Sequence, residues 1–198
     1  MPLFQIHGAL GGCGASAVAW TVAQQVRADV AVDFSAHQGG LAWCAAGDTD
    51  VSWPRILVAD IQREELLAVS RTVDGIVVCS GGQPPPQTVV QPVLLSQSAS
   101  GSVVIDSGEK MDGAVTLTVM PNHLRAMKRM KGHTGWVLCS LAADGVPTSL
   151  VQRSLPDAVV IFFKQQSKVH KSLQLGYAMP RTSAMRSAVS EWLSHVGK

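Results

Sequence analysis

The chain has 198 residues, of which 46% are hydrophobic and 15% are charged, and its formal net charge is +2. This composition is too apolar for a disordered chain and supplies enough side chains for one core, so a single domain over residues 1–198 is expected. The small, scattered positive charge gives no indication of a nucleic-acid partner.

The N-terminal segment lacks the basic region and long apolar stretch of a signal peptide. No apolar run reaches the roughly 18 to 20 residues of a bilayer span. The cysteines, without CxxC spacing, lie in or beside apolar runs and are expected to be reduced core residues; they are Cys13, Cys44, Cys79 and Cys139. These features together predict a cytoplasmic protein.

Short apolar runs alternate with longer segments of helical period, which favours an α/β fold with a mostly parallel sheet flanked by helices. Strands are expected at Leu3 to His7, Val30 to Asp33, Gly75 to Cys79, Val103 to Asp106, Val115 to Val119, Gly135 to Cys139 and Ala158 to Phe162. Helices are expected at Ala15 to Arg27, Gln62 to Arg71, Thr88 to Gln97, Asn122 to Met130, Thr148 to Leu155 and Ser183 to Val196. Two segments rich in Gly, Pro or Trp, Gly39 to Pro54 and Gly81 to Pro86, are expected to be ordered loops over the sheet.

The first expected strand runs directly into a glycine-rich loop, GALGGCGAS over residues 8–16, and an alanine-rich helix follows. A strand, a glycine loop and a helix N-terminus together form an anion site, because glycines let backbone N–H groups approach a phosphate closely. Ser16 could offer its hydroxyl to a phosphate or to a magnesium ion. The loop residues predicted to bind a cofactor are Gly11, Gly12, Cys13, Gly14, Ala15 and Ser16.

A working phosphate loop also needs a lysine just before its serine or threonine, and Ala15 occupies that position. Each lost charge-assisted contact forfeits on the order of 1.5 to 3 kcal/mol. ATP or ADP with magnesium is therefore expected to bind weakly or not at all, and hydrolysis should suffer more than binding. A glycine turn that only lets strand and helix pack tightly is an equal alternative on this reasoning.

A dinucleotide fold is a second interpretation. Gly8, Gly11 and Gly14 give GxxGxxG spacing, and Asp33 ends the next strand about 20 residues on, where a ribose-binding carboxylate would lie. A short-chain dehydrogenase, however, would carry a lysine four residues after its tyrosine, and Tyr177 is followed at that spacing by Arg181. An oxidoreductase that binds NAD or NADP therefore stays as the less favoured alternative.

Three further stretches accompany the loop: VAVDFSAHQGGLAW at 30–43, VDGIVVCSGGQPPP at 73–86 and SVVIDSGEKMDGAV at 102–115. Over nearly the whole chain this series resembles the CpaE/TadZ-like branch of the MinD/ParA (SIMIBI) P-loop family. It is especially similar to the actinobacterial septum-site-determining or secretion-neighbourhood CpaE-like proteins, whose pattern has a GGxGAS loop, a VDxDPxGGGLD segment, a Trp-Pro pair and a VVxDLPR strand end. Longer relatives add an N-terminal receiver-like domain that this sequence lacks.

The resemblance assigns roles residue by residue. The matching positions are Gly11, Gly12, Gly14, Ala15 and Ser16 in the loop, Asp33, Gly39, Gly40 and Leu41 in the second segment, and Trp53 and Pro54 in the pair. The family's signature lysine falls at Leu10, so both loop lysines are absent. Asp106 falls at the Walker B aspartate, while Ser35 replaces the second carboxylate of the DxD segment. The resemblance thus implies a pseudo-ATPase without catalytic residues, in which only Ser16 and Asp106 are weak magnesium candidates.

Family membership implies a protein that positions a Tad/Flp pilus or secretion machine, or that marks a septum or pole, as a homodimer with protein partners. It would be cytoplasmic, at a pole or peripheral at the inner face of the membrane. The competing enzyme hypothesis is a slow ATPase that takes a lysine from elsewhere, such as the dimer partner, and depends on Asp106.

Two segments could contact a membrane or a partner, and a plainer structural role is favoured for each. The cations of residues 123–131 are expected on a solvated helix face. The apolar stripe of the last helix has the width of a core-facing helix rather than of a membrane anchor. Trp43 and Trp53 could anchor a partner or lie buried over the sheet edge. The histidines show no ligand spacing, and none is assigned a role.

Overall fold

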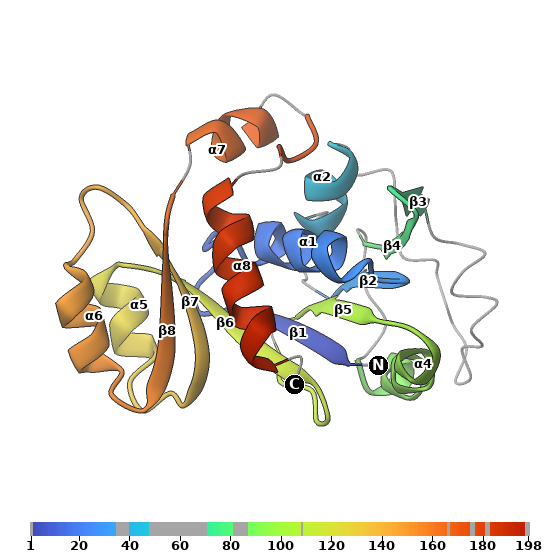
Figure 1. Ribbon diagram of the computed structural model, residues 1–198, viewed down its shortest axis with the longest axis horizontal. Coiled ribbons are helices and arrows are strands. Elements are labelled where there is room, and N and C mark those ends of the chain that lie inside the picture. Colours follow the sequence, from blue (N-terminus) through green and yellow to red (C-terminus); the bar gives the residue numbers. More distant parts are fainter. Residues whose placement is uncertain are drawn as a thin grey trace.

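The computed structural model describes residues 2–34, 40–47, 71–80, 87–107, 109–165, 167–174, 177–180 and 183–196. Its described strands form an eight-stranded sheet in the order β3-β4-β2-β5-β1-β6-β7-β8, with helices on both faces (Figure 1). The strands are β1 Leu3–Gly8, β2 Val30–Asp33, β3 Arg71–Val73, β4 Ile76–Cys79, β5 Val103–Asp106, β6 Val115–Pro121, β7 Gly135–Leu141 and β8 Ala158–Lys164. The predicted mostly parallel sheet is confirmed, since β3 pairs antiparallel with β4 and the other described neighbours pair in parallel.

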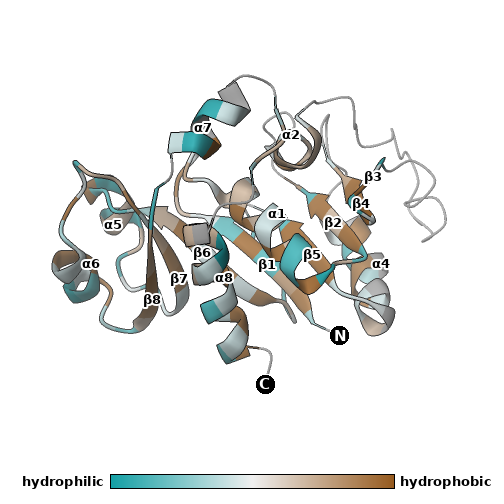
Figure 2. Ribbon diagram, turned by 45° about the horizontal axis from the view of Figure 1, so that its top comes forward, coloured by the Kyte–Doolittle hydropathy of each residue, from teal (hydrophilic) through white to brown (hydrophobic). Residues whose placement is uncertain are grey.

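Helices cover the sheet in two layers. The described helices are α1 Ala15–Val26, α2 Gly40–Ala46, α4 Gln87–Ser100, α5 Leu124–Arg129, α6 Thr148–Ser154, α7 Ser167–Gln174 and α8 Ser183–Val196. Buried side chains of α1, α2 and α8 share one apolar cluster on one face, while α4 and the α5–α6 pair fill two clusters on the other. The central strands appear brown in Figure 2 because, covered on both faces, they are almost continuously apolar.

The last helix, α8, packs on the core as predicted. Trp192 is fully buried, and its ring lies edge-on to Phe4 with ring centroids 5.5 Å apart. Met185, Ala188 and Val189 of the same stripe are also buried. The stripe that could have served as a membrane anchor is therefore occupied by the sheet. Within the described residues, no helix has the length and apolarity needed to span a membrane.

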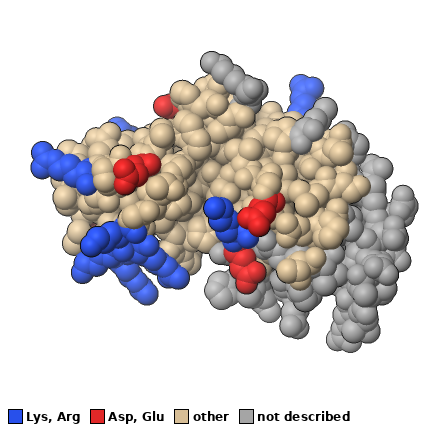
Figure 3. All heavy atoms as spheres, turned by 90° about the horizontal axis from the view of Figure 1, so that it is seen from below, with Lys and Arg blue, Asp and Glu red and all other residues tan. Residues whose placement is uncertain are grey.

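The basic segment also follows its prediction. Ala126 and Met127 of α5 are buried, whereas the cations of α5 and of the turn after it are exposed. These cations are Arg125, Lys128, Arg129 and Lys131. Figure 3 shows Lys and Arg side chains gathered at the α5–α6 end of the molecule. The helix thus has a core face and a solvated basic face.

Two predicted boundaries are wrong. Residues 40–46 form α2 rather than part of a loop, because the N–H groups of Leu41 and Ala42 donate hydrogen bonds to the side chains of Asp33 and Ser80, which lie at the ends of β2 and β4. The helix predicted to end at Arg71 does not do so, since Arg71 begins β3, which turns back onto β4 through Asp74 and Gly75 with φ of +52° and +81°. The rest of that helix (62–70), residues 48–54 and the 81–86 turn lie outside the described residues. Helix α7 was not predicted from its polar sequence.

The parallel register brings the ends of three central strands to one edge of the sheet. Ile6 of β1 is opposite Asp106 of β5, and Asp106 is opposite Asp33 of β2. Both aspartates therefore lie beside the point where β1 ends at Gly8 and the glycine loop begins. The carboxyl edge of a parallel sheet is where α/β folds place ligands.

Candidate functional site

The glycine loop connects β1 to α1 with the backbone geometry of an anion site. Gly12 and Gly14 have φ of +74° and +90°, in the left-handed region that favours glycine. Gly14 is the N-cap of α1 and supplies no side-chain cap. The first N–H groups of a helix have no partner within the helix, so this end of α1 is open to an anionic ligand.

The loop is fixed to the sheet by its backbone. The N–H of Ala9 donates to the carbonyl of Val119 over 2.9 Å, and the N–H of Cys13 donates to the carbonyl of Leu10 over 3.3 Å. A Cβ added to Gly8 would lie 2.9 Å from Sγ of Cys13, so the strand end and the loop approach too closely for a larger residue. The loop is therefore a preformed feature of the fold.

The two positions where the resemblance places lysines are occupied by residues that make apolar contacts. Leu10 is half-buried and packs against the cluster under α5 and α6. Ala15 is half-buried and packs against the cluster under α1 and α8. These positions contribute packing in place of positive charge, so the loop holds the geometry of a phosphate site without its cations.

Asp106 lies beside the loop at the end of β5 and is 4% exposed. Burial, and secondly the negative charge of Asp33, raise its pKa to about 7, while a hydrogen bond with the Ser16 side chain acts in the opposite direction. Within the described part of the chain, its Oδ2 atom is buried without a hydrogen-bond partner. A buried carboxylate oxygen with no partner fits either a proton or a bound cation.

Asp33 is engaged in the structure of the fold. It is 1% exposed, and its Oδ2 accepts hydrogen bonds from the Leu41 N–H at 3.0 Å and from the Ser80 hydroxyl at 2.9 Å. Ser80 Oγ in turn accepts from the Ala42 N–H at 3.1 Å. Asp33 and Ser80 thus cap α2, and this buried, engaged carboxylate does not support the ribose-binding role of the dinucleotide interpretation.

The start of α2 lies against the loop serine. A Cβ added to Gly40 would be 2.5 Å from Ser16 Oγ and 3.7 Å from Asp33 Oδ2, which explains the glycine at this position. The structure therefore brings Ser16, Asp33, Gly40 and Asp106 together. Ser35 lies outside the described residues. Ser80 was missed by sequence reasoning, although its place directly after β4 at the same sheet edge was a usable signal.

Magnesium fits this site only together with a nucleotide. Ser16 and Asp106 supply the oxygen ligands that magnesium prefers, but the described residues contain no group of three or more His, Cys, Asp or Glu side chains that could hold a metal ion. The remaining ligands would have to be phosphate oxygens and water. The nearby thiols are poor ligands while protonated, because burial raises the pKa of Cys13 and raises that of Cys44 to about 12.

No protein-family model matches the chain, and no curated protein sequence matches it. Solved structures do. The MinC–MinD cell division protein complex of Aquifex aeolicus matches with a TM-score of 0.70 at 10% identity, over 98% of this chain and 96% of that one. The septum site-determining protein MinD of Pyrococcus horikoshii, complexed with Mg-ADP, matches with a TM-score of 0.68 at 15% identity, over 99% and 97%.

A plasmid partition protein of Borrelia burgdorferi bound to AMPPNP matches with a TM-score of 0.67 at 10% identity, over 98% of this chain and 99% of that one. Because the identities are low, these likenesses show the fold. The chain has the MinD/ParA P-loop NTPase fold, and the α/β prediction is confirmed at that level.

Proposed function

We propose that this chain is a MinD/ParA-like localisation or scaffold protein that does not hydrolyse ATP. The observation that carries the proposal is the loop from Gly8 to Ser16. Its backbone keeps the left-handed glycines of a phosphate site, while Leu10 and Ala15 pack as apolar residues where the family carries lysines. Without those cations, the loop lacks the positively charged side chains that stabilise the charge developing during phosphoryl transfer.

Its cellular role is proposed from the resemblance to the CpaE/TadZ-like branch. The protein would position a Tad/Flp pilus or secretion machine, or a septum or pole site, as a homodimer that binds a protein partner. It would act in the cytoplasm, at a pole or at the inner face of the membrane. Support comes from the ordered motifs, and from structural neighbours that are division and partition proteins, one of them in complex with MinC.

Weak nucleotide binding is the second candidate, and one observation favours it. Asp106 Oδ2 is buried without a hydrogen-bond partner among the described residues, and Ser16 lies beside the carboxylate. A magnesium ion bound with a nucleotide would neutralise phosphate charge, with Ser16 and Asp106 holding it. The N–H groups of the loop and of the first turn of α1 would hold the phosphates.

A titration of the purified protein with ATP, ADP and NAD, with and without magnesium, separates these functions. Thermal stability is measured first, and calorimetry follows any saturable shift. The scaffold function predicts no shift at millimolar ligand. A saturable ATP shift that is lost in Ser16→Ala supports the weak nucleotide switch, and a shift with NAD or NADP alone supports the oxidoreductase.

A measurement of ATP hydrolysis tests the proposal more directly than the binding titration. The scaffold function predicts no magnesium-dependent ATP hydrolysis by the wild-type protein. A slow ATPase would instead show hydrolysis that requires magnesium and is abolished in Asp106→Ala, and this result would overturn the proposal. Hydrolysis that persists in Asp106→Ala would point to a contaminating enzyme and would count against the slow-ATPase candidate.

A further inference from the structure

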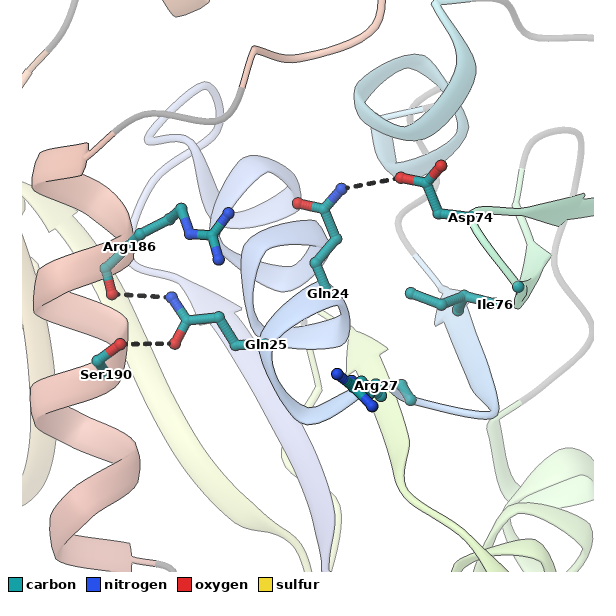
Figure 4. Close-up of a pocket in the computed structure, with 9 residues that line it drawn as sticks. Gln24, Gln25, Arg27, Asp74, Ile76, Arg186 and Ser190 are labelled. Atoms are coloured by element: carbon teal, nitrogen blue, oxygen red, sulfur yellow. Dashed lines mark hydrogen bonds between the residues drawn. The ribbon is translucent and has the colours of Figure 1, made fainter.

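A polar cavity of about 660 Å³ lies at the opposite end of α1 from the glycine loop (Figure 4). It is formed between the C-terminal end of α1, the first half of α8 and the turn between β3 and β4. The lining includes Gln24, Gln25, Arg27, Asp74, Arg186 and Ser190. Helix α1 has 12 residues, so about 18 Å of helix separates this cavity from the loop.

Two guanidinium groups from different helices line the cavity. Arg27 comes from the end of α1 and Arg186 from α8. In the part of the chain that the structure describes, neither guanidinium has a hydrogen-bond or ion-pair partner, and the bond recorded for Arg186 uses its backbone carbonyl. Asp74 is the one carboxylate of the described lining, and its Oδ2 accepts from Gln24 Nε2 at 3.2 Å. The lining therefore carries a net positive charge.

Side-chain hydrogen bonds of Gln25 connect α1 to α8 beside the cavity, and they are drawn as dashed lines in Figure 4. Gln25 Nε2 donates to the backbone carbonyl of Arg186 at 2.8 Å, and the Ser190 hydroxyl donates to Gln25 Oε1 at 2.9 Å. These bonds tie α1 to α8 beside the cavity. The segments that carry the two cations are therefore fixed relative to each other before any ligand arrives.

The backbone at Arg27 is the second observation that points to a function for its side chain. Arg27 is the C-cap of α1, with φ of +51° and ψ of +56° in the left-handed region. Helices commonly place glycine in this conformation, because a Cβ crowds the neighbouring backbone. Non-glycine residues held in this conformation cluster at active sites and ligand-binding segments.

We propose that this cavity binds a small polyanion that carries phosphate or carboxylate groups. Guanidinium groups recognise both kinds of oxygen with paired N–H donors, and two of them can hold two anionic groups of one molecule. The volume lies in the range of small-molecule sites, and the polar lining suits a hydrated anion rather than an apolar ligand. The proposal does not depend on the function proposed for the glycine loop.

The test is a thermal-shift titration with sodium pyrophosphate and, separately, with sodium citrate, at an ionic strength held constant with sodium chloride. The wild-type protein is expected to show a saturable rise in melting temperature. The anion that reaches half of this rise at the lower concentration identifies whether the cavity prefers phosphate or carboxylate groups. Arg186→Gln loses the response, although it keeps the carbonyl that Gln25 binds. Arg153→Gln, an equal charge change at an exposed site on α6, keeps it.

Two further variants separate binding from folding and from the other site. Arg27→Gly loses the anion response without a fall in the melting temperature of the free protein, because glycine suits the left-handed C-cap and offsets the lost charge at the helix end. Ser16→Ala, at the glycine loop, keeps the response. The proposal is overturned by a response that survives both arginine changes or disappears in Ser16→Ala, and equally by a wild-type protein with no saturable shift.

Discussion

An anion site needs a suitable backbone geometry and cationic side chains, and each end of α1 has only one of these two features. At the N-terminal end, the glycine loop offers left-handed glycines and the N-terminus of α1, but it carries the apolar residues Leu10 and Ala15 and lies beside the buried carboxylate of Asp106. At the C-terminal end, Arg27 faces a cavity that Arg186 also lines, without a loop built for phosphate. One end has the geometry and the other has the charge.

This division shows that backbone geometry and cationic side chains are separate contributions to anion binding. The geometry of the loop follows from the strand–glycine–helix connection, and it forms here with Leu10 and Ala15 and without a lysine. No cation is among the causes that set the pKa of Asp106. The electrostatic consequence of a loop without lysine is therefore measurable in the folded protein without any ligand.

The largest effect is expected at Asp106. Its folded-state pKa, about 7, lies above the value of 3.8 for an unperturbed carboxyl, so stability is full below about pH 4 and is lost as the pH rises through 7. Asp106→Asn removes the cost of ionisation. At pH 8 the variant should exceed wild type by on the order of 2 to 4 kcal/mol in free energy of unfolding, and the difference should shrink toward zero at pH 4.

Urea unfolding between pH 4 and pH 8 measures this difference. Asp157→Asn, the same substitution at an exposed position before β8, serves as the matched control. An Asp106→Asn variant that is less stable than wild type at pH 8 would mean that another group in the folded protein compensates the ionised carboxylate.

Restoring a cation to the loop is the next largest effect. Ala15→Lys should tighten ATP binding roughly 10- to 100-fold, because a hydrogen bond to a charged group contributes about 1.5 to 3 kcal/mol. Ala15→Met, of similar length without charge, is the control for added bulk. Calorimetric titration with Mg-ATP measures both variants. Equal affinities for the two would show that charge is not what the loop lacks.

Much of this site could be predicted from the sequence, because it depends on local patterns. The strands Val30–Asp33 and Val103–Asp106 and the helix Ser183–Val196 begin and end where their apolar periodicity indicates. The glycine loop follows from its spacing between a strand and a helix, whereas the roles of Leu10 and Asp106 came from the resemblance, and the strand register places Asp33 and Asp106 at one sheet edge.

The remainder depends on contacts between distant segments. Helix α2 was read as a loop because its cap comes from Asp33 and Ser80, on two other strands, and not from a residue before it. The hydrogen bonds that Asp33 accepts from Leu41 and Ser80 are likewise invisible in the sequence. The cavity joins Arg27 and Arg186, which only the packing of α8 on α1 brings together.

A smaller loss of stability is expected when the cap of α2 is removed. This change tests how much the hydrogen bonds of Asp33 and Ser80 stabilise the fold beside the glycine loop. Ser80→Ala removes the donor to Asp33 and the acceptor for the Ala42 N–H, both in a buried network. The free energy of unfolding should fall by about 1 to 3 kcal/mol. Ser154→Ala, which loses an exposed hydroxyl bond within α6, should change it by less. Equal losses in urea unfolding would show that the buried cap adds nothing beyond an ordinary surface bond.

The smallest loss of stability is expected when Gln25, which lines the cavity, is replaced. Gln25→Ala removes the hydrogen bonds to the Arg186 carbonyl and to Ser190, and because these bonds are solvent-exposed the loss of stability should be only about 0.5 to 1 kcal/mol. Both guanidinium groups remain, so the pyrophosphate response should weaken but persist. Gln152→Ala on α6 is the matched control. If Gln25→Ala abolished the response as completely as Arg186→Gln, geometry rather than charge would dominate at this end of α1, and the contrast between its two ends would fail.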